Sequence, residues 1–133
     1  MTANKNLSRD TQVLIYILKN IQKIQNAIKY FNCDLSTNTQ RSLSNNEYAF
    51  DLCSMYMAQI GENVKLLTES SKRELSKVVD FRVLRYFRNM IDHNYEKVNR
   101  LMLQSYISLM ISRPVVTAFR NRLVYCQNNK QSK

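Results

Sequence analysis

Apolar residues recur at steps of three and four along most of the chain, which is the spacing of α-helices that bury one face. The longest such stripe begins after Ser8 or Asp10 and predicts a first helix that runs to about Phe31. The segment 32–43 that follows is rich in Asn, Ser and Thr and has no such period. It is therefore typical of a loop.

Helix-start signals predict where the next helix begins. Ser44, with Glu47 three residues later, forms a capping box and predicts a second helix that runs to about Thr68. Gly61 lies inside this helix, where glycine costs about 1 kcal/mol relative to alanine. A glycine in this position is expected to permit the close approach of another helix.

The second half of the chain carries similar signals. Ser71 and Glu74 form another capping box and predict a short helix over about 72–79. Asp80 is the expected N-cap of a longer helix that follows. Two further helices are expected, one from Asn99 to about Ile111 and one with Pro114 in its first turn.

Composition supports helices over strands. The chain has one glycine and one proline, whereas a sheet protein needs many tight turns built from these residues. We therefore predict an all-α fold, a single antiparallel bundle of five to six helices. The 133 residues suit one domain, with a core over about 10–126 and a frayed polar tail at 127–133.

The charge balance favours a polyanionic partner such as RNA. The chain has 20 Lys and Arg against 10 Asp and Glu, a formal net charge of +10. Arg82, Arg85 and Arg88 recur every three residues and form a basic ridge that is predicted to follow an RNA backbone. The alternative interpretation is a solvated face that aids solubility and pairs with nearby carboxylates.

Several functional classes are disfavoured. A single glycine excludes glycine-rich phosphate loops and dinucleotide fingerprints. Cys33, Cys53 and Cys126 are odd in number and include no Cys-x-x-Cys pair, and the chain opens with no signal segment. No apolar run approaches the roughly 20 residues of a membrane span. We therefore expect a cytoplasmic protein with reduced thiols and no cofactor. We also expect no metal site, since the chain has one histidine.

Candidate chemistry lies in the stretch 88–95. Arg88 and His93 are five residues apart, which places them on different faces of an unbroken helix. They converge only if the helix unwinds near Ile91 or Asp92 and leaves His93 on a turn. Asp92 and Asn94 flank His93, and both residue types favour helix ends. We therefore expect a break there.

These residue types suit cleavage of a phosphodiester without a metal. Imidazole exchanges protons near neutral pH, and the guanidinium of Arg88 can neutralise charge on a phosphate. Asn89 is expected to bond phosphate or to orient His93. One histidine is poorly suited to act as both base and acid, so we expect a two-fold homodimer with two Arg88–His93 pairs in one cleft. The alternative is that His93 is an ordinary helix-end residue.

Two segments together resemble a known family. The pattern Arg-x-x-x-x-His-x-Tyr is present as Arg88, His93 and Tyr95, and Asn89 stands at its usual second position. Upstream, the run 60–67, Ile-Gly-Glu-Asn-Val-Lys-Leu-Leu, is similar to a second segment. On these motifs the chain resembles the HepT-like ribonucleases of the HEPN superfamily over roughly residues 10–125. Phe81 departs from the tryptophan common in the family.

The resemblance implies a specific biology. Members are homodimeric, metal-independent ribonuclease toxins of toxin–antitoxin pairs, with the Arg and His at the dimer cleft. Their antitoxin is a minimal (MNT-type) nucleotidyltransferase, and in some pairs it transfers AMP to the motif tyrosine, here Tyr95. The resemblance also places Glu62 near the site. Asp92, which flanks His93 in the sequence, is expected to support the pair. Two alternatives remain: a non-catalytic HEPN module that binds RNA or a nucleotidyltransferase, and a secreted helical signalling factor.

Overall fold

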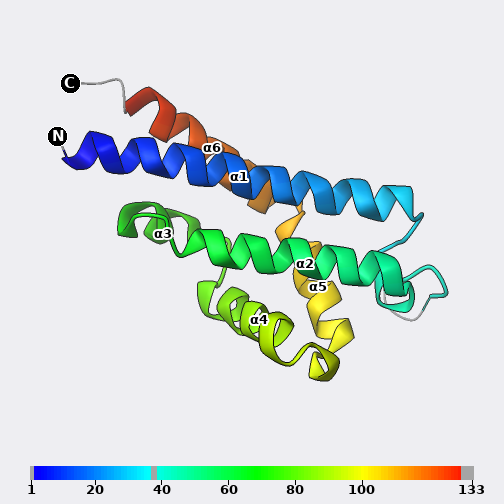
Figure 1. Ribbon diagram of the computed structural model, residues 1–133. Coiled ribbons are helices and arrows are strands. Elements are labelled where there is room, and N and C mark those ends of the chain that lie inside the picture. Colours follow the sequence, from blue (N-terminus) through cyan, green and yellow to red (C-terminus); the bar gives the residue numbers. More distant parts are fainter. Residues whose placement is uncertain (1, 37–38, 130–133) are drawn as a thin grey trace.

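The computed structural model describes residues 2–36 and 39–129. Over these residues the chain is all-helical and contains no strand, which confirms the predicted fold class. Within the same ranges no helix has the length and apolar character needed to cross a membrane. The elements are α1 (Thr2–Tyr30), η1 (Leu43–Asn45), α2 (Glu47–Val64), α3 (Glu69–Leu75), α4 (Phe81–His93), η2 (Tyr95–Lys97), α5 (Arg100–Met110) and α6 (Arg113–Asn129) (Figure 1).

Helix α2 lies at the centre of the arrangement. It packs antiparallel to α1 on one side and against α4 on the other, while α6 runs along α1 (Figure 1). The short α3 packs on α6 at one end of the bundle. The core between these helices is apolar, and its largest fully buried side chains include Leu14, Ile17, Phe50, Ile60, Leu84 and Phe119. The α2–α4 contact positions the candidate site.

The first helix starts earlier than predicted, at Thr2 instead of near Ser8 or Asp10. Asp10 does not cap it, because the Asp10 side chain is fully buried inside the bundle. Its carboxylate accepts hydrogen bonds from Thr68 N at 3.0 Å, Thr68 Oγ1 at 2.6 Å and Ser71 Oγ at 2.5 Å. Asp10 therefore ties the start of α3 to α1.

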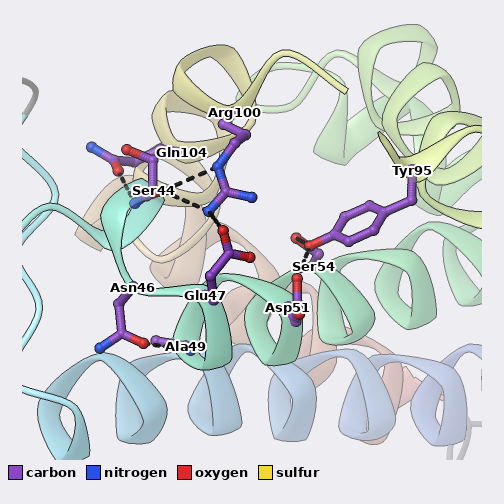
Figure 2. Close-up of polar contacts among 9 residues, drawn as sticks. All are labelled: Ser44, Asn46, Glu47, Ala49, Asp51, Ser54, Tyr95, Arg100 and Gln104. Atoms are coloured by element: carbon purple, nitrogen blue, oxygen red, sulfur yellow. Dashed lines mark hydrogen bonds and ion pairs between the residues drawn. The ribbon is translucent and has the colours of Figure 1, made fainter. Parts of the chain in front are cut away.

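The predicted cap of the second helix is wrong by two residues. Asn46 caps α2, accepting a hydrogen bond from Ala49 N at 3.0 Å. Ser44 lies in η1, where its N–H donates to Gln104 Oε1 at 2.7 Å (Figure 2). Its carbonyl accepts two bonds from the Arg100 guanidinium, at 3.1 and 2.6 Å. Because these contacts hold Ser44 against α5, Ser44 does not cap α2.

The boundaries of α3 also differ from the prediction. Thr68 was expected to end the second helix, but α2 ends at Val64 and Thr68 is the N-cap of α3. Its hydroxyl accepts a bond from Ser71 N at 3.3 Å. Ser71, the predicted cap, is buried inside α3 instead, and the helix ends at Leu75, before residue 79. The buried Asp10 carboxylate, which binds both Thr68 and Ser71, therefore determines that α3 begins after Thr68 and not after Ser71.

Other predicted boundaries are confirmed. Asp80 caps α4 through Arg82 N at 2.9 Å, and Asn99 caps α5 through Met102 N at 3.0 Å. Pro114 lies in the first turn of α6. Of the tail predicted over 127–133, residues up to 129 continue α6, and 130–133 lie outside the described residues.

The cysteines form no disulfide. Cys53 and Cys126 are buried, and Cys33 is partly exposed. Burial raises the pKa of the Cys53 thiol to about 12, so this group stays protonated and unreactive at neutral pH.

Candidate functional site

Arg88 lies where α4 crosses α2 at Gly61. A Cβ added to Gly61 would stand 3.0 Å from the Cβ of Arg88, and 3.3 and 3.4 Å from its Cδ and Cγ. The expectation that Gly61 permits close helix approach is therefore confirmed. The aliphatic part of Arg88 occupies the space that the missing side chain leaves, and its side chain is only 17% exposed.

The Arg88 guanidinium gathers three of the predicted site residues around it. Nη1 donates to Glu62 Oε1 at 2.7 Å and lies 3.6 Å from Asp92 Oδ2. Nη2 donates to Asn89 Oδ1 at 3.0 Å. Within the described part of the chain, Nε is buried without a hydrogen-bond partner. Arg88 is thus held between two carboxylates, one on α2 and one on its own helix.

Glu62 is the more exposed of the two carboxylates on Arg88, with 52% of its side chain exposed against 39% for Asp92. The hydrogen bond from Lys65, at 3.1 Å, is the main cause that lowers the pKa of Glu62, and the charges of Lys65 and Arg88 lower it further. Glu62 therefore remains ionised at neutral pH. An ionised carboxylate on Arg88 competes with any phosphate that approaches the same guanidinium.

His93 was predicted to lie on a turn beyond the helix, but it lies in the last turn of α4. Helix α4 does not unwind near Ile91 or Asp92 but continues unbroken to His93, and Asn94 caps it through a bond from Asn94 N to Met90 O at 2.8 Å. The pairing of Asp92 with Arg88 four residues earlier favours the helical conformation at Asp92. His93 is exposed at the helix end.

Arg88 and His93 therefore do not converge within one chain. On a continuous α-helix a step of five residues turns the side chain by about 140°. Arg88 points to the α2 side of α4, as its contacts with Gly61 and Glu62 show. Among the described residues His93 has no side-chain hydrogen-bond partner, so its ring is available to another molecule.

Tyr95 lies just beyond this helix, in η2, and packs against α2 (Figure 2). Its hydroxyl donates to Asp51 Oδ1 at 2.5 Å and lies 3.3 Å from Ser54 Oγ. Its ring stacks on Phe50, with centroids 6.3 Å apart. Burial, followed by the Asp51 hydrogen bond, raises the pKa of Tyr95 to about 12.

Sequence reasoning did not identify Asp51 and Ser54. They stand three residues apart on α2, so a shared helix face was readable from the sequence. Nothing in the sequence linked that face to a tyrosine more than 40 positions later. A pocket of about 180 Å³ lies beside these residues, and its wall includes Asp51, Ser54, Ile91, Asp92 and Tyr95. Asp92 thus contacts both the Arg88 cluster and the Tyr95 pocket.

The predicted basic ridge is spread around α4. Arg82 and Arg88 are six residues apart, which corresponds to about 120° around the helix axis. Arg82 is highly exposed and lies 3.5 Å from Asp80. Arg85 lies between them in angle and lines a pocket with Gly61. Two other basic side chains lie on the Arg88 side of α4: Lys65, which pairs with Glu62 at 3.1 Å, and Arg85, which lines the pocket beside Gly61. Arg82 faces another part of the surface.

Comparison of the chain with models of protein families, with curated proteins and with solved structures gave no match. In the ranges 2–36 and 39–129, no group of three or more His, Cys, Asp and Glu side chains lies close enough to hold a metal ion. The reactive groups at the candidate site are a tethered guanidinium, an exposed imidazole and a hydrogen-bonded phenol.

Proposed function

We propose that the protein is a metal-independent endoribonuclease that acts as a homodimer and serves as the toxin of a toxin–antitoxin pair. The observation that carries the proposal is the Arg88 cluster. A guanidinium held against Gly61, with an exposed imidazole at the end of the same helix, is a suitable pair of groups for phosphodiester chemistry. The net charge of +10 and the resemblance to HepT-like ribonucleases support the choice of RNA.

In this proposal Arg88 binds the phosphate to be cleaved. A phosphate oxygen displaces Glu62 or Asp92 from the guanidinium and accepts bonds from it. As the 2′-oxygen attacks phosphorus and the 5′-oxygen leaves, negative charge grows on the remaining phosphate oxygens. The fixed positive charge of Arg88 stabilises that charge. Asn89, which is bonded to Arg88, helps to keep the guanidinium in place.

His93 moves the protons. One imidazole takes the proton from the ribose 2′-hydroxyl, and a second gives a proton to the leaving 5′-oxygen, which yields a 2′,3′-cyclic phosphate and a 5′-hydroxyl. Because Arg88 and His93 point about 140° apart on one helix, a single chain is poorly suited to this reaction. A two-fold dimer supplies both arginines and both histidines to one cleft.

Regulation by a nucleotidyltransferase antitoxin is the second part of the proposal, and it rests on the sequence resemblance. Transfer of AMP from ATP to the Tyr95 hydroxyl, with release of pyrophosphate and of the phenolic proton, would replace its bond to Asp51 with a bulky phosphodiester. The added negative charge would lie beside Asp92, which shares the pocket wall with Tyr95 and contacts Arg88. Repulsion of substrate phosphate from Arg88 would then inhibit cleavage. We further propose a cytoplasmic location, where RNA and the antitoxin are present.

The test is RNA cleavage by the purified protein in the presence of a metal chelator. We expect products with 2′,3′-cyclic phosphate ends, and at least about 100-fold slower cleavage by Arg88→Ala and by His93→Ala. Arg120→Ala, which removes an exposed cation on α6, is the matched control and should cleave normally. Cleavage at the wild-type rate by both site variants would refute the assignment.

Mixing subunits tests the shared cleft. If one cleft needs both histidines, a dimer with one His93→Ala subunit is inactive. An equal mixture that has exchanged subunits then contains about one quarter wild-type dimers, so its activity should be half that of the same mixture before exchange. Activity unchanged by exchange would show that one His93 suffices for each site.

A non-catalytic HEPN module that binds RNA or a nucleotidyltransferase is the second candidate. The observation that favours it is the separation of Arg88 and His93 around α4. It predicts RNA binding that weakens steeply with salt, no cleavage by the wild type, and full binding by His93→Ala.

A further inference from the structure

A second pocket, of about 210 Å³, lies between α2, α3 and α4 on the other side of Gly61 from Tyr95. Three of its seven lining residues are basic. Lys65 at the end of α2, Lys72 on α3 and Arg85 on α4 line it, together with one carboxylate, Glu69. The remaining wall is formed by Gly61, Val64 and Phe81. Three cations from three separate helices thus face one small space.

The positive charge of this pocket is only partly compensated. Lys72 lies 3.7 Å from Glu69, and Lys65 lies 3.1 Å from Glu62. Glu62 also binds Arg88, so its single negative charge is shared between two cations. In the described part of the chain, Arg85 makes no ion pair. An anion entering the pocket therefore meets at least one guanidinium without a counter-charge.

The pocket is aligned with the candidate cleavage site. Along α4, Arg85 follows Phe81 by four residues and Arg88 follows Arg85 by three, so the three side chains share one face of the helix. Arg85 and Arg88 are separated by about 4.5 Å along the helix axis. Glu62 connects the pocket with the Arg88 cluster directly, because it contacts both Lys65 and Arg88.

The size and chemistry of the pocket favour one unit of a polymer. Pockets for whole small molecules usually enclose about 300–1,000 Å³, more than the 210 Å³ found here. One phosphate needs cations, which Lys72 and Arg85 supply, and the attached nucleoside needs an apolar or aromatic wall, which Phe81 supplies. A nucleic-acid strand offers this combination at each successive nucleotide.

We propose that the pocket of Lys65, Lys72 and Arg85 is a nucleotide subsite, which binds the RNA phosphate neighbouring the one held by Arg88. This inference rests on the proposed ribonuclease function for the neighbouring phosphate on Arg88, but not for the binding of RNA in the pocket itself. The subsite fixes the position of the strand, and the guanidinium of Arg88 then meets a defined phosphodiester. The same cations would bind a single-stranded RNA that is not cleaved.

The test compares two triple variants in which the same charge is removed. One carries Lys65→Gln, Lys72→Gln and Arg85→Gln. The control carries Lys19→Gln, Lys29→Gln and Arg120→Gln, which remove exposed cations from α1 and α6. Binding of a short 2′-O-methyl oligoribonucleotide, which lacks the 2′-hydroxyl needed for cleavage, is measured by fluorescence anisotropy over a range of salt concentrations. Circular dichroism checks that both variants are folded.

We expect the pocket variant to bind about tenfold more weakly than the control variant, with a salt dependence whose logarithmic slope is smaller by about 0.7 for each phosphate that the variant no longer neutralises. Equal weakening in the two variants would overturn the proposal. Competition by polyglutamate as effective as that by the oligonucleotide would overturn it as well, because the pocket would then be a general site for acidic proteins.

Cleavage of unmodified RNA, measured in parallel, separates this proposal from the ribonuclease assignment. Wild-type protein that shows pocket-dependent binding without cleavage supports the subsite and refutes the enzyme. Cleavage that depends on Arg88, together with equal oligonucleotide binding by the pocket variant and the control variant, supports the enzyme and refutes the subsite.

Discussion

The Cβ of Arg88 lies 3.0 Å from the position that a Cβ on Gly61 would occupy. This distance is shorter than ordinary van der Waals contact between carbons, so glycine at position 61 is a condition for the present position of α4. The same contact holds the Arg88 side chain against α2, where Glu62 reaches its guanidinium at 2.7 Å. The geometry of the candidate site therefore depends on a residue that has no side chain.

Gly61→Ala is expected to lower the free energy of unfolding by about 1 kcal/mol. Overpacking against Arg88 costs about 1–3 kcal/mol, whereas the better helix propensity of alanine returns about 1 kcal/mol. Urea unfolding measures the difference. In a double-mutant cycle with Arg88→Gly, which removes the clashing Cβ, the Gly61→Ala change should no longer destabilise and should instead stabilise by about 1 kcal/mol relative to Arg88→Gly alone. A stabilisation of the single variant by about 1 kcal/mol would show that the helices separate easily.

Glu62→Gln is expected to tighten RNA binding, because the change frees Arg88 from a competing carboxylate. The effect should be only roughly two- to fivefold, because surface ion pairs are weak. The His93→Ala background prevents cleavage during the measurement, and titration at several salt concentrations gives the affinity. Glu74→Gln is the matched control, since Glu74 pairs with Lys77 away from Arg88. Weaker binding by Glu62→Gln would instead show that Glu62 orients Arg88 for phosphate.

Tyr95 is expected to ionise near pH 12, where its pKa lies. The difference in ultraviolet absorbance between the wild type and Tyr95→Phe during an alkaline titration isolates its phenolate from those of the other tyrosines. Asp51→Asn should shift that ionisation to lower pH, because the Asp51 hydrogen bond and charge both raise the pKa of Tyr95. Ionisation of Tyr95 near pH 10 in the folded wild type, the ordinary value for tyrosine, would contradict both the burial of Tyr95 and its hydrogen bond to Asp51.

The raised pKa of Tyr95 also has a consequence for stability. The folded state holds the Tyr95 proton more tightly than the unfolded state, whose tyrosines ionise near pH 10. The stability contributed by Tyr95 is therefore complete below about pH 10 and is lost as pH rises towards 12. Tyr95→Phe should show a smaller loss of unfolding free energy over this range.

Asp10→Ala is expected to lower the free energy of unfolding by about 3 kcal/mol, because it removes the acceptor of the partly buried Thr68 donors and of the buried Ser71 hydroxyl. Arg122 adds to the effect, since its Nε donates to Ser71 Oγ at 2.9 Å in the same network. Chemical denaturation measures the change. Gln12→Ala, an exposed position on the same helix, should change it by less than about 0.5 kcal/mol.

The two wrong N-cap predictions, at Ser44 and Ser71, share one cause. Ser44 and Ser71 carry the side chains of good N-caps, and so do Asn46 and Thr68 nearby. The choice between the competing caps is made by distant residues: Gln104 and Arg100 hold Ser44, and the buried Asp10 holds Thr68 and Ser71. Local patterns contain no information on these partners.

The amino-acid pattern was sufficient for the helical class, for an expected five to six helices, and for the caps at Asp80 and Asn99, because these depend on periodicity and on interactions within a few residues. The missing side chain of Gly61 was enough to expect a close helix approach, but it did not name Arg88 as the partner. It also identified Arg88 and His93 as candidates. Where these side chains lie was decided by packing in three dimensions. Packing against Gly61 and pairing with Glu62 and Asp92 hold Arg88 on the α2 side of an unbroken helix, and His93 is left facing away.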